Sequence, residues 1–231
     1  MTGRQLSFDL PPNVALGAED YFVTAANAQA HALVMGDAPW PSGKLGLIGP
    51  RQAGKSHLAR LWQRRVGATA IDAARIVAGA TLPSNGPVML EDADRLAPHA
   101  EEAVFHLHNR LDAAGHALLV TAAIPPNRWG TALPDLASRM QAMTLAHIHD
   151  PDEALLRAVL AKHFADRQLS PAPQVIEWLT TRIERSFAAA AATVATLDAA
   201  ALDRQAGITR AFARSVLGPD AGGAPRRPDR S

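Results

Sequence analysis

Short apolar runs alternate with longer segments of helical periodicity over most of the chain. The apolar runs of strand length are 45–48, 68–72, 88–90, 117–122 and 142–147. Apolar residues recur at helical spacing in 22–35, 57–66, 99–114 and 133–140. Strands that alternate with helices predict a parallel sheet covered by helices on both faces, because each right-handed crossover packs back onto the sheet. The predicted fold class is therefore α/β.

The pattern changes after Asp150, where only helical periodicity continues. Asp150, Pro151 and Glu153 have the spacing of a helix cap, first turn and capping box. Further helices are predicted at 175–183, 186–202 and 209–217. We expect an N-terminal peptide at 1–12, an α/β domain at 13–150, a helical lid domain at 151–217 and a disordered tail at 218–231.

One loop matches a phosphate-binding pattern. Residues 49–56 fit G-x-x-x-x-G-K-[ST] at every specified position, with a predicted strand before them and a predicted helix after. The glycines let backbone N–H groups point inward, and the helix start adds its positive dipole end. Lys55 is predicted to contact the β- and γ-phosphates, and the Ser56 hydroxyl to ligate Mg²⁺. The predicted nucleotide-binding residues are Gly49, Pro50, Arg51, Gln52, Ala53, Gly54, Lys55, Ser56 and His57.

Two carboxylates follow the apolar run at 88–90. Nucleotide-loop ATPases place acidic residues at such a strand end, where they hold magnesium and polarise water. Glu91 is therefore a predicted Mg²⁺ ligand, and Glu91 with Asp92 form the predicted catalytic pair. A solvated strand end is the alternative explanation for this pair, and Asp94 has the position of a cap for the next helix.

The first residues form a separate apolar peptide. Pro11 and Pro12 set off the segment Gln5, Leu6, Ser7, Phe8, Asp9 and Leu10 from the rest of the chain. Its three apolar side chains suit insertion into a groove of a partner protein. An edge strand on the chain's own sheet explains the same spacing, and both interpretations stay open.

Arg139 closes the predicted helix 133–140 and has two interpretations. An exposed arginine is the simpler one. The other is an arginine finger, whose guanidinium stabilises charge on a phosphoryl group held by a neighbouring subunit. Such a residue acts in trans and needs a partner.

The amino-acid composition argues against several kinds of site and partner. The 231 residues contain no cysteine, which excludes disulfides and thiolate metal sites. The formal net charge of +1 gives no overall basic field for nucleic acid, and no apolar stretch indicates a signal peptide or a membrane span. The histidines at 99, 106, 108 and 116 lack the spacing of a metal site. A cytoplasmic protein without a membrane partner is predicted.

These motifs together resemble a known family. The loop at 49–56, the acidic strand end at Glu91, the pair Pro125-Pro126 and the run Leu136-Ala137-Ser138-Arg139 are similar to the AAA+ module of the replication initiator DnaA. Little chain follows residue 217, so we expect no C-terminal helix-turn-helix domain. The peptide at 5–10 is similar to the one with which Hda proteins bind the DNA polymerase sliding clamp. The chain therefore resembles the Hda family of DnaA-related AAA+ regulators.

The resemblance implies a function, partners and cofactors. It implies negative regulation of replication initiation, in which Arg139 promotes hydrolysis of ATP bound to DnaA, while the clamp tethers the protein. DNA would be reached indirectly through the clamp, and a second copy of the chain stays open as a partner. The resemblance also implies ADP or ATP with Mg²⁺ in the chain's own site. Arg185 is the candidate lid arginine for the phosphates, although Ala188 takes that position in another register.

The chain's own hydrolysis is predicted to be weak or absent. Ala123 stands where the DnaA pattern Thr-x-Asp has a polar residue near the γ-phosphate. Two other functions stay open: an active AAA+ ATPase that acts on DNA or as a loader, and a small-molecule kinase. The alanine-rich segment after Asp150 argues against the kinase, which needs a lid with clustered arginines.

Overall fold

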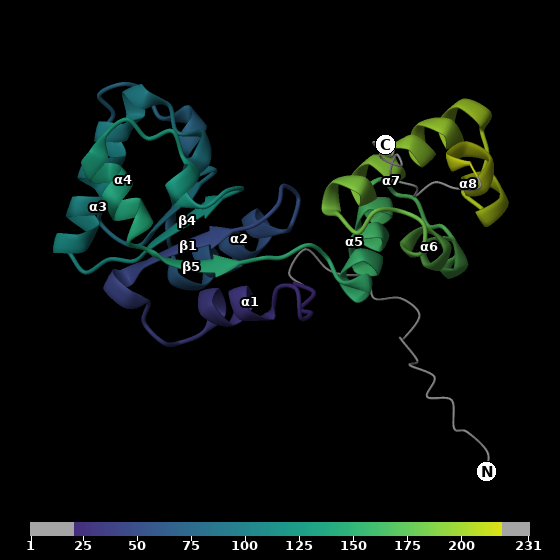
Figure 1. The fold of residues 1–231 in the computed structure, drawn as a ribbon, viewed down its shortest axis with the longest axis horizontal. Coiled ribbons are helices and arrows are strands. Elements are labelled where there is room, and N and C mark those ends of the chain that lie inside the picture. The colour runs from purple at the N-terminus through teal and green to yellow at the C-terminus, as the bar shows by residue number, and fades with distance from the viewer. Residues whose placement is uncertain (1–20, 219–231) are drawn as a thin grey trace, which may run out of the picture.

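A single five-stranded parallel sheet forms the centre of the first part of the chain. The computed structural model describes residues 21–218 (Figure 1). The strands are β1 (Lys44–Ile48), β2 (Thr69–Asp72), β3 (Val88–Glu91), β4 (Leu118–Ala122) and β5 (Thr144–His147). They pair in the order β2-β3-β4-β1-β5, and every pair is parallel. The predicted α/β class is confirmed.

Helices cover both faces of this sheet. They are α1 (Ala28–Met35), α2 (Lys55–Val66), α3 (Glu101–Ala113) and α4 (Pro134–Gln141). Met89 of β3 packs in one apolar cluster with Trp62 of α2. Its neighbours Val88 and Leu90 pack in a second cluster with Leu107 of α3. Because side chains alternate along a strand, the sheet separates two apolar layers, and its strands are apolar on both sides.

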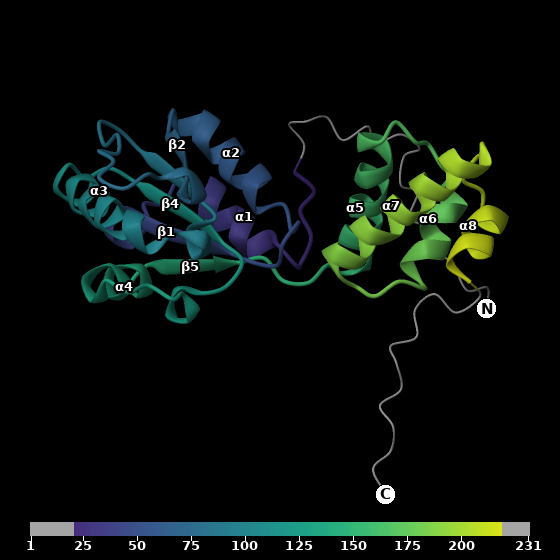
Figure 2. The same ribbon diagram turned by 90° about the horizontal axis from the view of Figure 1, so that it is seen from above.

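The helices after β5 have a core of their own. They are α5 (Glu153–Asp166), α6 (Pro173–Thr180), α7 (Phe187–Arg204) and α8 (Arg210–Leu217). Leu156, Leu160 and Phe164 of α5 pack against Trp178 of α6 and Val194 of α7. Figure 2 shows these four helices gathered beyond the end of the sheet. Within the described residues no helix has both the length and the apolar surface that crossing a bilayer requires.

Helix α5 starts differently from the sequence prediction. The predicted cap, Asp150, is wrong: the N-cap is Asp152, whose Oδ1 accepts a hydrogen bond of 2.8 Å from the Leu155 N–H. Pro151 is buried ahead of the helix, and Glu153 is its first residue. An aspartate two positions closer to the helix therefore satisfies a free N–H group of the first turn.

Candidate functional site

The predicted phosphate loop connects β1 to α2 and is tightly packed at its start. A Cβ atom on Gly49 would lie 2.7 Å from the Ile148 carbonyl oxygen, so this position requires glycine. Gly54 precedes α2 with a φ of +83°, a left-handed conformation that favours glycine. The first N–H groups of α2 therefore open toward the space above the loop, where an anion would be stabilised.

Lys55 is folded onto this loop. Its side-chain Nζ donates to the carbonyl oxygens of Gly49 at 2.8 Å and Pro50 at 2.7 Å. Burial lowers the pKa of Lys55, and the nearby Asp92 and Asp94 oppose that change. These two carbonyl oxygens hold the ammonium group against the loop.

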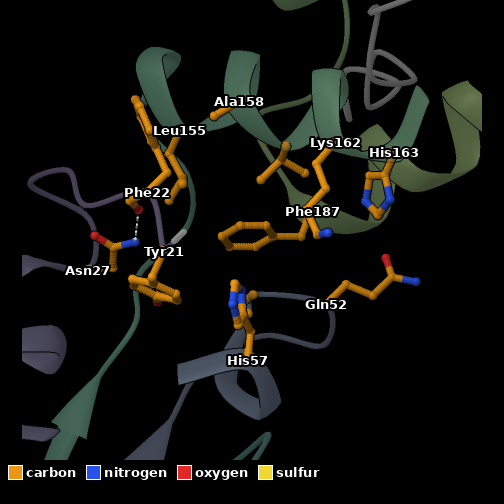
Figure 3. Close-up of a pocket in the computed structure, with 13 residues that line it drawn as sticks. Tyr21, Phe22, Asn27, Gln52, His57, Leu155, Ala158, Lys162, His163 and Phe187 are labelled. Atoms are coloured by element: carbon orange, nitrogen blue, oxygen red, sulfur yellow. Dashed lines mark hydrogen bonds between the residues drawn. The ribbon is translucent and has the colours of Figure 1, made fainter. Parts of the chain in front are cut away.

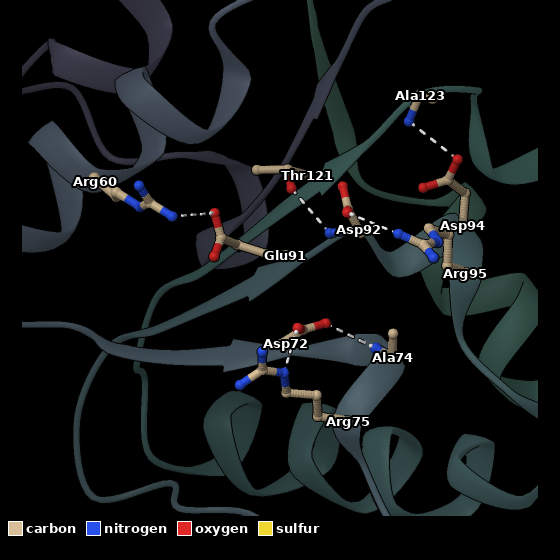
Figure 4. A network of polar contacts seen from close by, with 10 residues as sticks. All are labelled: Arg60, Asp72, Ala74, Arg75, Glu91, Asp92, Asp94, Arg95, Thr121 and Ala123. Carbon is tan, nitrogen blue, oxygen red and sulfur yellow. Dashed lines mark hydrogen bonds and ion pairs between the residues drawn. The ribbon is translucent and has the colours of Figure 1, made fainter. Parts of the chain in front are cut away.

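The carboxylates at and after the end of β3 contact the end of β4 and nearby arginines (Figure 4). Asp92 has a φ of +52°, and its N–H donates to Thr121 Oγ1 at 3.0 Å. Asp94 Oδ2 accepts from the Ala123 N–H at 3.2 Å, so Asp94 connects β3 to the end of β4. Glu91 Oε1 is buried without a hydrogen-bond partner among the described residues, and the nearest guanidinium nitrogen, on Arg60, is 4.0 Å away.

A cavity of about 410 Å³ lies above the loop. Its lining residues are Arg51, Gln52, Gly54, Lys55, Ser56, His57, Asp92, Asp94, Arg95, Ala123 and His163. Most of the predicted loop residues and Asp92 line this space, whereas Gly49, Pro50, Ala53 and Glu91 do not. We call this space the loop cavity. Asp94, Arg95 and His163 are residues that the sequence analysis did not assign to it.

A second, mostly apolar cavity of about 130 Å³ adjoins the first (Figure 3). Tyr21, Phe22 and Asn27, which precede α1, line one side. Leu155, Ala158, Val159, Lys162 and His163 of α5 and Phe187 of α7 line the other side. We call this space the apolar cavity. It lies between the α/β part and the helical part of the chain.

Hydrogen bonds and ring contacts fix the Tyr21 side of the apolar cavity. Asn27 Nδ2 donates to the Phe22 carbonyl at 2.9 Å. The Tyr21 ring stacks on His31 and meets His57 edge-on, with ring centres 5.7 Å apart in both pairs. Burial raises the pKa of Tyr21 to about 12, so the phenol stays neutral. This wall presents an aromatic surface to the cavity.

Arg139 lies away from both cavities. Its guanidinium carbon is 5.2 Å from the centre of the Phe105 ring on α3, a cation–π contact. The loop before α4 is fixed by Glu101, whose carboxylate oxygens accept from the N–H groups of Ala132 at 3.0 Å and Leu133 at 2.7 Å. The half-buried guanidinium is therefore held at the α3–α4 surface, and its role as a finger stays a prediction.

Two predicted sites remain, the lid arginine and the N-terminal peptide. Arg185 is exposed, with its guanidinium 4.0 Å from Glu153, and it lines neither cavity. Ala188, the alternative register, is also exposed. From this region of α7 it is Phe187 that reaches the apolar cavity. The peptide at 5–10 lies outside the described residues.

Comparisons with known proteins identify the fold. No family model matches the chain. Domain III of the Thermotoga maritima replication initiation protein DnaA aligns with a TM-score of 0.68 and 15% identity, over 92% of this chain and 100% of that domain. A DnaA bound to AMPPCP and single-stranded DNA aligns at 0.59 and 15%, over 84% and 68% of the two chains. The Thermotoga maritima RuvB branch migration motor aligns at 0.56 and 14%, over 86% and 69%. The chain has the α/β fold of these DnaA and RuvB structures.

Proposed function

We propose that this protein is a nucleotide-bound regulator of DnaA, of the Hda kind. In this proposal ADP or ATP spans the two cavities, with the adenine base between Tyr21 and Phe187 and the phosphates above the loop. The division at residue 150 into a nucleotide-binding domain and a lid belongs to the same proposal. The adjoining apolar and polar cavities support it, because they match the two chemically different ends of a nucleotide.

The side chains around the loop fit a nucleotide with Mg²⁺. Lys55 would exchange its bonds to the loop carbonyls for phosphate oxygens, and the N–H groups at the start of α2 would donate to them. Ser56 and a carboxylate would hold the ion. Among the described residues there is no cluster of three ligating side chains, so the remaining ligands would be phosphate oxygens and water. The ion's contribution is to neutralise phosphate charge.

Two features favour binding over turnover in this chain's own site. Ala123 lines the loop cavity without a polar side chain, and its N–H is already bonded to Asp94. Asp92 lies 3.7 Å from Arg95, so part of its charge is neutralised. Arg95 therefore competes with a nucleophilic water for the Asp92 carboxylate. The nucleotide in this site would then be a structural ligand.

The position of Arg139 carries the regulatory part of the proposal. It lies on α4 against Phe105 and does not line the loop cavity, which supports a role outside the chain's own site. A planar guanidinium stabilises a transferring phosphoryl group through paired N–H donors. The fold shared with DnaA domain III supports DnaA as that molecule, because related AAA+ domains can pack alike.

The proposal also includes a tether to the sliding clamp and a cytoplasmic location. Residues 5–10 would bind the sliding clamp, which brings the protein to DNA indirectly, in the cytoplasm. A second copy of the chain stays open as a further partner. Replacing Leu6, Phe8 and Leu10 with alanine is expected to abolish clamp binding in surface plasmon resonance without lowering the melting temperature. Unchanged clamp affinity would refute the tether.

Hydrolysis of DnaA-bound ATP tests the central claim. With DNA-loaded clamp present, Arg139→Ala is expected to lower the stimulated rate about 10³-fold or more, the usual contribution of an arginine finger, with nucleotide affinity unchanged. Arg182→Ala is the matched control, because its guanidinium stacks 4.8 Å from the Trp178 ring outside both cavities. An equal effect of both substitutions, or a loss of the chain's own nucleotide binding in Arg139→Ala, would contradict the proposal.

An active ATPase is the second candidate function. The complete loop, with Lys55 and Asp92 both lining its cavity, favours it. Steady ATP hydrolysis by the isolated protein, increased by DNA and abolished by Lys55→Ala, would establish this function. A rate at the level of Lys55→Ala would support the regulator.

A further inference from the structure

The two cavities share a narrow set of residues. Gln52, Gly54, His57 and His163 line both of them. Three of these belong to the phosphate loop and the start of α2, and His163 belongs to α5, on the opposite side. A nucleotide that fills both cavities must pass its ribose and inner phosphates between these two sides. Among residues 21–218, His163 is the one residue of the helical part that lines the loop cavity.

His163 has an unused hydrogen-bonding atom at this junction. Its Nε2 is buried and has no hydrogen-bond partner among the described residues. Figure 3 shows the ring extending from α5 toward Gln52. Buried polar side-chain atoms in folded proteins almost always have a partner, so this Nε2 is available to a ligand that enters the cavity.

The helical part offers few other groups for the phosphates. Lys162, the neighbour of His163, lines only the apolar cavity, and its Nζ lies 3.3 Å from Asp166. Arg185 lies outside both cavities. Ala188 carries no donor. The candidate lid arginine, Arg185, precedes α7 and does not line the junction, whereas α5 supplies a histidine there.

We propose that His163 binds the diphosphate of the nucleotide from the helical side, with its imidazole Nε2–H donating to a phosphate oxygen. This assignment rests on the proposed nucleotide binding and adds a residue to it. Binding of one ligand by both the phosphate loop and α5 would also hold the helical part against the α/β part. In this arrangement His163 is the residue of the helical part that contacts phosphate, and the apolar cavity contacts the base.

The protonation of His163 agrees with this role. Burial lowers its pKa, and the neighbouring charge of Arg167 lowers it further. The free ring is therefore mostly neutral at pH 7. A phosphate opposite the ring would favour the charged form, which is a stronger donor.

Affinities for adenosine, AMP and ADP test the assignment, measured by titration calorimetry on the full chain. His163→Leu is expected to weaken ADP binding about 10- to 100-fold, the value of one hydrogen bond to a charged group. Adenosine affinity should change less than about twofold, because adenosine has no phosphate. His163→Gln keeps an N–H donor and should retain ADP affinity within about threefold. His106→Leu, an exposed histidine on α3, is the control.

Each other result overturns the assignment. Unchanged ADP affinity in His163→Leu would show that the ring does not contact phosphate. An equal loss for adenosine and ADP would show that it shapes the apolar cavity, and an equal loss in His163→Gln would exclude the donor. Absence of ADP and ATP binding in the wild-type protein would instead refute the proposed nucleotide binding itself. Thermal melting of each variant separates these results from unfolding.

Discussion

Glu101 provides the sharpest test of how the Arg139 helix is held in place. This carboxylate is 4% exposed and accepts two hydrogen bonds, from the N–H groups of Ala132 and Leu133 immediately before α4. A hydrogen bond to a charged group contributes about 1.5–3 kcal/mol. Glu101→Ala removes two of them and leaves two N–H groups unpaired. We expect it to lower the free energy of unfolding by about 3 kcal/mol, and Glu101→Gln by about half as much, since the amide keeps one acceptor.

The neighbouring residue supplies the control for this experiment. Glu102 is 84% exposed, and its nearest cationic group is His106 at 3.6 Å. Such a surface pair contributes little, so Glu102→Ala should change the unfolding free energy by less than about 0.5 kcal/mol. In urea titrations followed by tryptophan fluorescence, Glu101→Ala should lower the midpoint by roughly 1 M. Equal midpoints for the two alanine variants would refute the reasoning.

Two further predictions concern the packing of the loop and a buried histidine. Gly49→Ala should destabilise the protein by about 1–3 kcal/mol in thermal melts, because the added Cβ would lie 2.7 Å from the Ile148 carbonyl oxygen. Gly86→Ala is the control: the space around Gly86 is open, so this substitution should have almost no effect. Burial, with the nearby charge of Lys44, lowers the pKa of His108, so the unfolded chain binds more protons below about pH 6.5. Stability should therefore fall below that pH by up to about 1.4 kcal/mol per unit, and His108→Leu should reduce the slope in urea titrations at pH 5 to 7. A slope unchanged by His108→Leu, or Gly49→Ala melting like Gly86→Ala, would contradict these two predictions.

Local sequence signals predicted most of the sheet and the loop. The strands are short apolar runs, and the loop is a contiguous motif between a strand and a helix, so neighbouring residues suffice to recognise them. The prediction of where α5 starts was wrong because it relied on neighbouring residues alone. Both Asp150 and Asp152 are local candidates for a cap, and the buried Pro151 places the first helical turn after the second of them.

Residues whose partners lie far along the chain could not be predicted in this way. Glu101 resembles an ordinary acidic residue in the first turn of a helix, but its hydrogen-bond partners are 31 and 32 residues further on. For His163, the sequence did contain a usable pattern. It lies eight positions after Leu155 and four after Val159, on the same side of α5, so a histidine continues an apolar stripe. A polar residue in such a stripe marks a surface that faces another part of the protein.

The distribution of unpaired buried atoms supports the location of the site independently of the loop motif. Five buried side-chain atoms lack hydrogen-bond partners among residues 21–218. Two of them, the Tyr21 hydroxyl and His163 Nε2, belong to residues that line the cavities. A third, Glu91 Oε1, immediately precedes Asp92 of the loop cavity. Because folded chains rarely leave such groups unpaired, their position at or beside the cavities agrees with the ligand proposed for this region. The same criterion makes Tyr21→Phe, which removes one of these atoms and keeps the ring, a test of whether that ligand reaches the hydroxyl.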